Sequence, residues 1–418
     1  MIAVALVLAL AATPATPEPP GKTLQATPSA AGPEAARSLR AAGLCTMCHP
    51  EARVEFERSI HGSEEVACVS CHGGDAAATD VAGAHAKDFK GRIRRKDVPE
   101  LCASCHADAQ RMRAYNLPTD QLALYRTSGH GQRLAAGNEK VAVCTDCHGV
   151  HDIRRTRDPA SSTFTLNIPR TCARCHTRGG PGQAGRPGED PFTDFAGSVH
   201  GVALLTQGNL SAPDCSRCHG AHGAAPPGIG DVDKVCGQCH ETTRAYFREG
   251  PHDTALQEAG MPECASCHSN HAIHHPDVAG MEAICQGCHD AGSPQAELAM
   301  QMKTLHQAAA QDLEAARRVV DEAAAVPLYV EDYRARLQEG QSALIESLPV
   351  MHAMDLKRVE GLTRRARALG EEVRSEVSGK LSERRWRRVG LMIFWFYLLV
   401  TIGILVMYRN RAAQAERP

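Results

Sequence analysis

The chain is poor in aromatic residues and, outside residues 1–12 and 389–408, in long apolar runs. Phe, Trp and Tyr together make up 4% of its 418 residues. Residues 41–292 are rich in Gly, Pro, Ala, Ser and Asp and contain few runs of Leu or Ile. Such a segment cannot bury enough apolar side chain to form a core of its own. The formal net charge is −2 with histidine neutral, so the chain also lacks the basic surplus that favours a nucleic-acid partner.

No cysteine lies outside one recurring motif. All 18 cysteines belong to nine copies of Cys-x-x-Cys-His between residues 45 and 289. This motif is the attachment signature of c-type haem, in which both thiols form thioethers to the haem vinyl groups and the histidine is the proximal iron ligand. The copies are Cys45-Cys48-His49, Cys68-Cys71-His72, Cys102-Cys105-His106, Cys144-Cys147-His148, Cys172-Cys175-His176, Cys215-Cys218-His219, Cys236-Cys239-His240, Cys264-Cys267-His268 and Cys285-Cys288-His289.

Other uses of paired cysteines fit this pattern poorly. A disulfide framework does not require a histidine after every second cysteine. A zinc site needs four ligands per metal, and a thioredoxin-like redox pair occurs once in a βαβ unit. The motifs therefore predict nine covalently bound c-type haems, whose porphyrins supply the missing core. We expect a mainly α fold with extensive irregular loops, in which residues 41–292 form a nonahaem domain.

A repeat groups eight of the nine motifs into four two-haem modules, which follow a lone haem at Cys45. Three stretches, residues 125–131, 195–201 and 246–253, begin with an aromatic residue and place a histidine before an extended motif, CxxCHxxH. A plain CxxCH follows each extended motif. A degenerate copy begins at residues 56–62; it lacks the last histidine of the extended motif but has His85 in the same interval.

The number of histidines matches two axial ligands per haem. Nine of the 21 histidines are proximal, and twelve remain. The repeat assigns eight of these as distal ligands: His61, His85, His130, His151, His200, His222, His252 and His271. The candidates for the ninth distal ligand are His306 and His352 on the C-terminal helices, and His274 and His275 in a loop.

Two histidines on every iron would leave no position for a substrate. Met residues are scarce in the haem region, and Met47 lies inside its own motif, so Met/His ligation, which raises the potential, is not expected. We therefore expect low-potential haems that exchange one electron with little rearrangement of ligands. The lone haem at Cys45 has no obvious distal partner in the sequence. It is the candidate for an open haem if neither His306 nor His352 reaches it.

The paired CxxCHxxH and CxxCH motifs, with SxHG histidines upstream, resemble the doubled-CxxCH multihaem cytochromes c of bacterial anaerobic and metal-reducing respiratory chains. Their ligation is similar to that of the small tetrahaem class III cytochromes. The resemblance covers roughly residues 40–292 and implies closely packed haem pairs that conduct electrons. Periplasmic quinol dehydrogenases of the multihaem type carry an N-terminal anchor, whereas this chain has a C-terminal apolar segment. Direct quinol oxidation by this subunit is therefore in doubt.

Both ends of the chain carry apolar segments. Residues 1–12 resemble the apolar and cleavage regions of a secretory signal peptide without its basic region, and a short N-terminal anchor is the alternative. Residues 13–40 are expected to form a flexible Pro/Ala-rich linker. Residues 389–408 carry no charge and are long enough to form a transmembrane helix, which leaves 409–418 as a cytoplasmic tail.

The charges around the apolar segment conflict with the expected orientation. Five basic residues precede it, and three follow it. The positive-inside rule alone would place the preceding side in the cytoplasm. Because c-type haem is attached outside the bacterial inner membrane, we expect the opposite, with the haem domain in the periplasm. The preceding arginines would then meet anionic lipid headgroups or a membrane partner.

Residues 293–388 are expected to form a helical neck between the haem domain and the membrane. They are rich in good helix formers, and Pro327 and Pro349 divide them into helices near 294–325, near 330–347 and from about 350. The last helix carries a heptad-like apolar seam of Val359, Leu362, Ala366, Leu369, Val373 and Val377.

Two functions are consistent with these features. The first is an electron carrier in the inner membrane that connects a quinone-linked or b-type cytochrome subunit of the membrane with periplasmic redox proteins or extracellular acceptors. The second is a multihaem oxidoreductase of the nitrite reductase or hydroxylamine oxidoreductase type, which needs one open haem. The CxxCK motif common in those nitrite reductases does not occur in this chain. The sequence identifies neither the electron donor nor the acceptor.

Overall fold

The computed structural model describes residues 43–64, 66–86, 88–182, 190–223, 232–274 and 277–415. These residues are mainly α-helical and contain no strand, which confirms the expected fold class. The predicted signal segment, residues 1–12, lies outside the described residues. So do the predicted linker, residues 13–40, and the ligand candidate His275.

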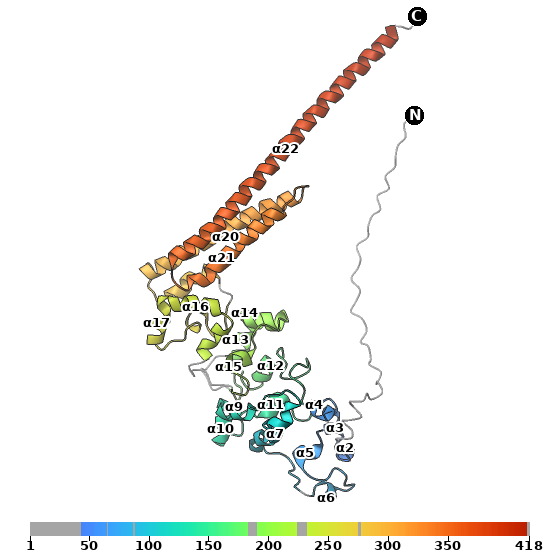
Figure 1. Ribbon diagram of the computed structural model, residues 1–418, viewed down its shortest axis with the longest axis vertical. Helices are drawn as coiled ribbons and strands as arrows, with labels where there is room; N and C mark the ends of the chain where they lie inside the picture. Colours follow the sequence, from blue (N-terminus) through green and yellow to red (C-terminus); the bar gives the residue numbers. More distant parts are fainter. Residues whose placement is uncertain are drawn as a thin grey trace. The chain divides into compact units, whose positions relative to one another are not determined.

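The chain divides into two compact units (Figure 1). The first comprises residues 1–93 and 149–154, and the second comprises residues 94–148 and 155–418. The helices of the first unit are all short, and two of them carry haem motifs. They are α2 (Cys45–Cys48), α3 (Pro50–Phe56), α4 (Ile60–Ser63), α5 (Cys68–His72) and α6 (Val81–Ala84).

The second unit begins with short helices joined by irregular segments. Its first half contains η1 (Arg95–Asp97), α7 (Val98–His106), α8 (Ala109–Arg113), α9 (Gln121–Thr127), α10 (Gly129–Ala135), α11 (Cys144–His148), α12 (Ile168–Ala173), α13 (Pro191–Gly197) and α14 (Val199–Gly201). It continues with η2 (Val202–Thr206), α15 (Cys215–His219), η3 (Val232–Gln238), α16 (Glu241–Glu249), α17 (Pro251–Glu258), α18 (Ala265–His268), η4 (Val278–Gly280) and α19 (Met281–Gln286). Few of these helices exceed two turns, because the segment lacks the apolar stripes that stabilise longer ones.

Three long helices end the second unit: α20 (Pro294–Ala324), α21 (Glu331–Met351) and α22 (Leu356–Ala415). The helix α20 starts where Ser293 caps it, since the Ser293 hydroxyl accepts a hydrogen bond from the Ala296 amide. The neck helices lie where the sequence predicts them. The helix α21 continues through Pro349 to its end at Met351, because a proline in the last turn removes only one amide donor.

The neck is a three-helix bundle, in which α20 and α21 lie along the first part of α22 (Figure 1). Within the predicted seam, Val359, Ala366, Val373 and Val377 are fully buried, and the other two members are half-buried. Leu313 of α20 and Leu337 of α21 pack into the same core. The heptad spacing thus predicted the buried face of α22.

The bundle also packs against the last haem-motif segments. Met302, Val350 and Val359 form a second apolar cluster, against which Tyr246 of α16 and Met281 of α19 pack. This cluster carries the contact between the neck and the short helices that precede it.

The helix α22 continues well beyond the bundle. It contains 60 residues, which corresponds to about 90 Å at the helical rise of 1.5 Å per residue. Its most apolar window has a mean hydropathy of 2.5, and none of that window is buried. In the described part of the chain, α22 is the one helix long and apolar enough to cross a membrane.

Gly340 of α21 lies where α20 and α21 pack closely. A Cβ on Gly340 would lie 2.8 Å from Leu313 Cδ2, whereas a Cβ on Gly361 would meet nothing within 4 Å. We expect Gly340→Leu to lower the free energy of unfolding by about 1–3 kcal/mol through overpacking. The measurement is thermal and denaturant unfolding followed by helical circular dichroism. Gly361→Leu is the matched control and should not destabilise the chain; equal stability of the two variants would contradict the packing.

Candidate functional site

The S-x-H-G signature forms a local structure that fixes a histidine at the start of a helix. In the second copy, Ser128 Oγ accepts a hydrogen bond from the Gly131 amide at 3.0 Å and donates to the Tyr125 carbonyl at 2.7 Å. A Cβ on Gly131 would lie 2.0 Å from that carbonyl oxygen, so only glycine fits. His130 lies between the serine cap and the glycine, which together determine its position.

The third copy repeats this geometry. Ser198 Oγ accepts from the Gly201 amide at 3.1 Å and donates to the Phe195 carbonyl at 2.7 Å. In the first copy, Ser59 Oγ accepts from the amide of His61 at 3.1 Å. The aromatic residue, the serine and the glycine of the repeat are therefore the local scaffold of its histidine.

A second local feature turns the chain after the extended motifs. The residue that follows the proximal histidine there has a left-handed backbone, with φ of 83° at Gly149, 79° at Gly220 and 67° at Ser269. This conformation ends the motif helix. The last histidine of each extended motif lies three residues after the proximal histidine, beyond this point.

Eight pairs of histidine rings face each other in the described residues, and each pair joins a proximal histidine to a predicted distal one. The ring centroids are 5.8 to 6.3 Å apart. The pairs are His49–His85, His72–His151, His130–His176, His148–His222, His200–His240, His219–His271, His252–His289 and His268–His352.

Six of the eight pairs follow two rules that the sequence did not reveal. An upstream histidine of the repeat faces the plain CxxCH of its own module, as His130 faces His176. The last histidine of an extended motif instead faces the extended motif of the preceding module, as His222 faces His148. Neighbouring modules are therefore interleaved, because each supplies a ring to the one before it.

Backbone hydrogen bonds connect the same neighbours. The Ile60 amide donates to the Ile153 carbonyl at 2.8 Å, and the Val199 amide donates to the Ile273 carbonyl at 2.9 Å. Each donor immediately precedes an S-x-H-G histidine, and each acceptor lies two residues after a histidine that ends the next module's extended motif. The interleaving thus involves the backbone as well as the rings.

The neck supplies the ring for the last extended motif. His352, which directly follows α21, faces His268 with ring centroids 6.1 Å apart. Its Nδ1 donates to the Leu348 carbonyl at 3.1 Å, so its Nε2 is the nitrogen available to a metal. His306 Nδ1 instead lies 2.9 Å from the hydroxyl of the fully buried Ser347. Of the two neck candidates, the structure brings His352 to a proximal histidine.

The motif at Cys45 also has a facing ring. The ring of His85 faces that of His49 with centroids 6.3 Å apart, and the tilted ring of Phe89 packs against His85 with centroids 4.3 Å apart. The expectation that this motif lacks an obvious distal partner is therefore corrected. The backbone at Ala84 and Asp88, on either side of His85, approaches Gly73 and Gly74 closely because these glycines have no side chain. A Cβ on either glycine would lie under 2.5 Å from one of the two carbonyl oxygens. Such close backbone approaches are invisible in the sequence.

The facing rings suit an iron held between two imidazoles. A metal–nitrogen bond is about 2 Å long, and the ring centre lies roughly 1 Å further, so rings on opposite sides of one iron have centroids roughly 6 Å apart. Burial, together with the neighbouring His222 and His106 rings, lowers the pKa of the His148 ring to about 4. The ring is therefore neutral at pH 7, as a metal ligand must be.

Further hydrogen bonds orient individual rings. His72 Nδ1 donates to the Gly91 carbonyl at 3.2 Å, and His151 Nδ1 lies 3.3 Å from Glu55 Oε2. Partners of this kind fix the orientation of a ligating imidazole and raise its basicity. They also leave Nε2 of both rings for the metal.

The attachment thiols of successive motifs are neighbours. Thiols of successive motifs lie close enough to shift one another's pKa in four cases, Cys45 with Cys68, Cys102 with Cys144, Cys172 with Cys215 and Cys236 with Cys264. Electrostatic contacts link further pairs in the second unit, Cys147 with Cys172, Cys218 with Cys236 and Cys267 with Cys285. The motifs from Cys102 to Cys285 therefore follow one another in space in their chain order.

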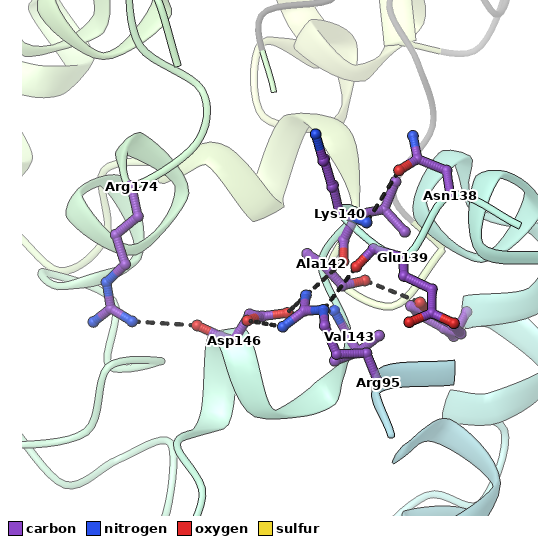
Figure 2. A network of polar contacts seen from close by, with 10 residues as sticks. Arg95, Asn138, Glu139, Lys140, Ala142, Val143, Asp146 and Arg174 are labelled. Atoms are coloured by element: carbon purple, nitrogen blue, oxygen red, sulfur yellow. Dashed lines mark hydrogen bonds and ion pairs between the residues drawn. The ribbon is translucent and has the colours of Figure 1, made fainter. Parts of the chain in front are cut away.

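Polar residues inside the motifs connect them (Figure 2). The Arg95 guanidinium donates to both carboxylate oxygens of Asp146, at 3.1 and 2.6 Å, and to the carbonyls of Glu139 and Val141. Asp146 lies within the motif that starts at Cys144, and its carbonyl accepts from Arg174 of the next motif at 3.2 Å. One network therefore spans two consecutive motifs and the segment before them.

Another ion pair connects the motifs at Cys236 and Cys264. Arg244 donates to both carboxylate oxygens of Glu263, at 2.8 and 2.9 Å, and their side chains are 17% and 9% exposed. The hydrogen bond from Arg244 lowers the pKa of Glu263. A bidentate pair of this kind is among the stronger polar contacts in proteins.

His61 and His106 stay predicted ligands, and the structure describes their surroundings. His61 is held by Ser59, and burial lowers the pKa of His106. The alternative loop candidate His274 is exposed.

Comparison with known proteins identifies two segments. Residues 60–177 match the family model described as cytochrome c3, and residues 208–245 match the doubled CXXCH motif. No curated protein and no solved structure matches the chain.

The two neck histidines provide a test of ligation. We expect His352→Ala to leave one haem without a second axial ligand, because the ring facing His268 is lost. That haem should become high-spin and bind CO when reduced, as measured by electron paramagnetic resonance and CO difference spectra. The control, His306→Ala, should keep every haem low-spin. Exchanged results for the two variants would contradict the assignment.

The Arg244–Glu263 pair predicts a pH-dependent effect. A carboxylate whose pKa is lowered by folding stabilises the fold above its unfolded pKa, and this contribution is lost as the pH falls through the folded pKa. We expect Glu263→Gln to lower the free energy of unfolding by about 1–3 kcal/mol at neutral pH, with the difference disappearing near pH 3. Denaturant titrations at both pH values measure it. The exposed Glu258→Gln is the control, and a pH-independent loss in Glu263→Gln would contradict the ion pair.

The nine attachment motifs, the facing histidine rings and the two family matches all indicate the same class of protein. The chain is a multihaem c-type cytochrome, a class that transfers electrons.

Proposed function

We propose that this chain is a membrane-anchored nonahaem cytochrome that carries electrons between a quinone-linked membrane subunit and periplasmic or extracellular acceptors. The observation that carries the proposal is the set of eight facing ring pairs. A site with a histidine on each side has no position for a substrate. Such sites suit electron transfer and exclude bond-making chemistry at the metal.

The haem and the protein would contribute different parts of electron transfer. A bound c-type haem supplies a one-electron couple. The cysteines would hold it covalently, and the two histidines would occupy both axial positions. Rings held by partners such as Gly91 and Leu348 need no rearrangement when the charge changes. Two imidazoles without a methionine favour a low potential.

The order of the attachment sites supports a conducting array. In the second unit, neighbouring thiols connect the motifs from Cys102 to Cys285 without a gap in chain order. The first unit holds the motifs at Cys45 and Cys68 side by side. Electrons would therefore pass between haems that are consecutive in the sequence. The neck enters this array at one place, through His352.

The helix α22 supports anchoring in the inner membrane. Its apolar part would cross the bilayer, with the haem domain in the periplasm, where c-type haem is attached. The electron donor or acceptor in the membrane would be a quinone-linked or b-type cytochrome subunit beside α22. Periplasmic redox proteins would exchange electrons with the haem domain.

The alternative, an oxidoreductase of the nitrite reductase or hydroxylamine oxidoreductase type, needs one open haem. The motif at Cys45 was the candidate for it, and the ring of His85 faces that motif's proximal histidine. This observation favours the carrier.

The carrier function predicts the spectrum of the purified protein. We expect nine covalent haems by intact-protein mass spectrometry, all low-spin, with no CO difference spectrum after reduction. The reason is that every iron has two histidine ligands. A high-spin signal, or CO binding by the unmodified protein, would favour the enzyme instead. A redox titration of the same sample should find every haem at low potential.

A further inference from the structure

The loop between α20 and α21 is apolar although it lies at the surface. Residues 323–330 contain no charged side chain, and their sequence is AAAVPLYV. Tyr329 is 70% exposed, Pro327 is exposed, and Val326 and Leu328 are half-buried. Acidic residues flank this stretch on both sides, at Asp321–Glu322 and at Glu331–Asp332. An uncharged tip between charged flanks is unusual for a loop that connects two surface helices.

This loop lies next to the start of the membrane span. Figure 1 shows the α20–α21 loop at the end of the bundle that faces the C-terminal part of α22. The Arg384 guanidinium of α22 donates to the Pro327 carbonyl at 3.3 Å. Leu328 and Leu381 pack against the same core cluster. The loop is therefore held at the level of residues 381–384.

The α20–α21 loop lies a short distance along α22 from the start of its uncharged stretch. From Arg384 to Val389, where the uncharged stretch begins, the helix rises about 7.5 Å at 1.5 Å per residue. The headgroup layer on each side of a bilayer is roughly 5–8 Å thick, the difference between the whole bilayer and its hydrocarbon core. The loop thus falls within the headgroup layer when α22 spans the membrane.

The side chains around the loop suit an anionic lipid surface. Trp386 is 71% exposed, and together with Tyr329 it places two aromatic side chains at the level that favours them in membranes. Arg384, Arg385, Arg387 and Arg388 occupy successive directions around α22 at 100° per residue and cover about half of its circumference. Their positive charge suits anionic lipid headgroups on the side of α22 that they cover.

We propose that the α20–α21 loop is a second membrane contact of this protein, in which Tyr329 and its apolar neighbours enter the headgroup layer. The arginines of α22 hold anionic lipid headgroups around it. The inference rests on the proposed anchoring by α22 and deepens it. Two contacts, the span and the loop, would fix the tilt of the neck relative to the bilayer.

The test uses the full-length haem-loaded protein and one added cysteine. Because the proposed thioethers consume all 18 native cysteines, a thiol-reactive nitroxide labels only the new residue. Three variants are labelled separately: Tyr329→Cys at the loop, Ile345→Cys on α21 and Ile402→Cys in the span. Each is placed in vesicles of phosphatidylcholine with phosphatidylglycerol. Collisions of the nitroxide with oxygen and with a water-soluble nickel complex then report its depth.

The position on α21 is the matched control. Ile345 is 55% exposed and lies about 24 Å along α21 from position 329, well outside the headgroup layer. We expect the label at 402 to be accessible to oxygen only, the label at 329 to be largely shielded from the nickel complex, and the label at 345 to be fully accessible to it. An unchanged haem spectrum in each variant verifies the fold.

The outcomes separate the two proposals. Free access of the nickel complex to position 402 would contradict anchoring by α22 itself. Shielding at 402 with free access at 329 would overturn the loop contact alone. Shielding at 329 in native membranes but not in vesicles would assign the loop to a protein partner and also overturn it.

The lipid charge is tested with the same label. Vesicles without phosphatidylglycerol should leave position 329 more accessible to the nickel complex. Arg385→Gln with Arg388→Gln should remove this dependence on the anionic lipid. The control pair Arg364→Gln and Arg374→Gln makes the same charge change on α22, about 20 to 40 Å from the span. This distance exceeds the screening length, so the control pair should preserve the dependence on the anionic lipid. Equal accessibility with and without phosphatidylglycerol would overturn the role of the arginines.

Discussion

Two imidazole rings held opposite each other, roughly 6 Å between their centres, are the contact on which the haem region depends. The polypeptide around them has too few apolar side chains to fold on its own account. What it provides is a set of short scaffolds, each of which fixes one histidine. The S-x-H-G cap and the left-handed turn after the extended motif are the clearest examples. The cofactors would then supply the core that the side chains lack.

Interleaving makes the modules depend on one another. Because each extended motif receives its second ring from the following module, no module completes its own sites. The last module has no successor, and the neck provides His352 in its place. The bundle of α20, α21 and α22 therefore acts as the cap of the repeat array, and it also carries the apolar part of α22. The structural consequence is that the neck and the array of motifs share one histidine-bearing turn.

Several features of the site followed from the sequence because they are local. The motif specifies two thiols and a proximal histidine within five residues, and the repeat identifies eight further histidines by their distance from a motif. The heptad seam of α22 predicted residues that are now found buried, since a helix places every third or fourth residue on one face. The end of α20 followed from Pro327 and the helix-forming residues before it, whereas α21 continues through Pro349.

The sequence by itself determined the cofactor class, the number of attachment motifs, the pool of candidate ligands, the neck and the apolar span. Only the tertiary structure decided which ring faces which, that His85 serves the motif at Cys45, and that His352 rather than His306 faces His268. The physical reason is that a facing pair joins residues far apart in the chain. Their meeting depends on close backbone approaches, such as those at Gly73 and Gly74, which no local pattern encodes.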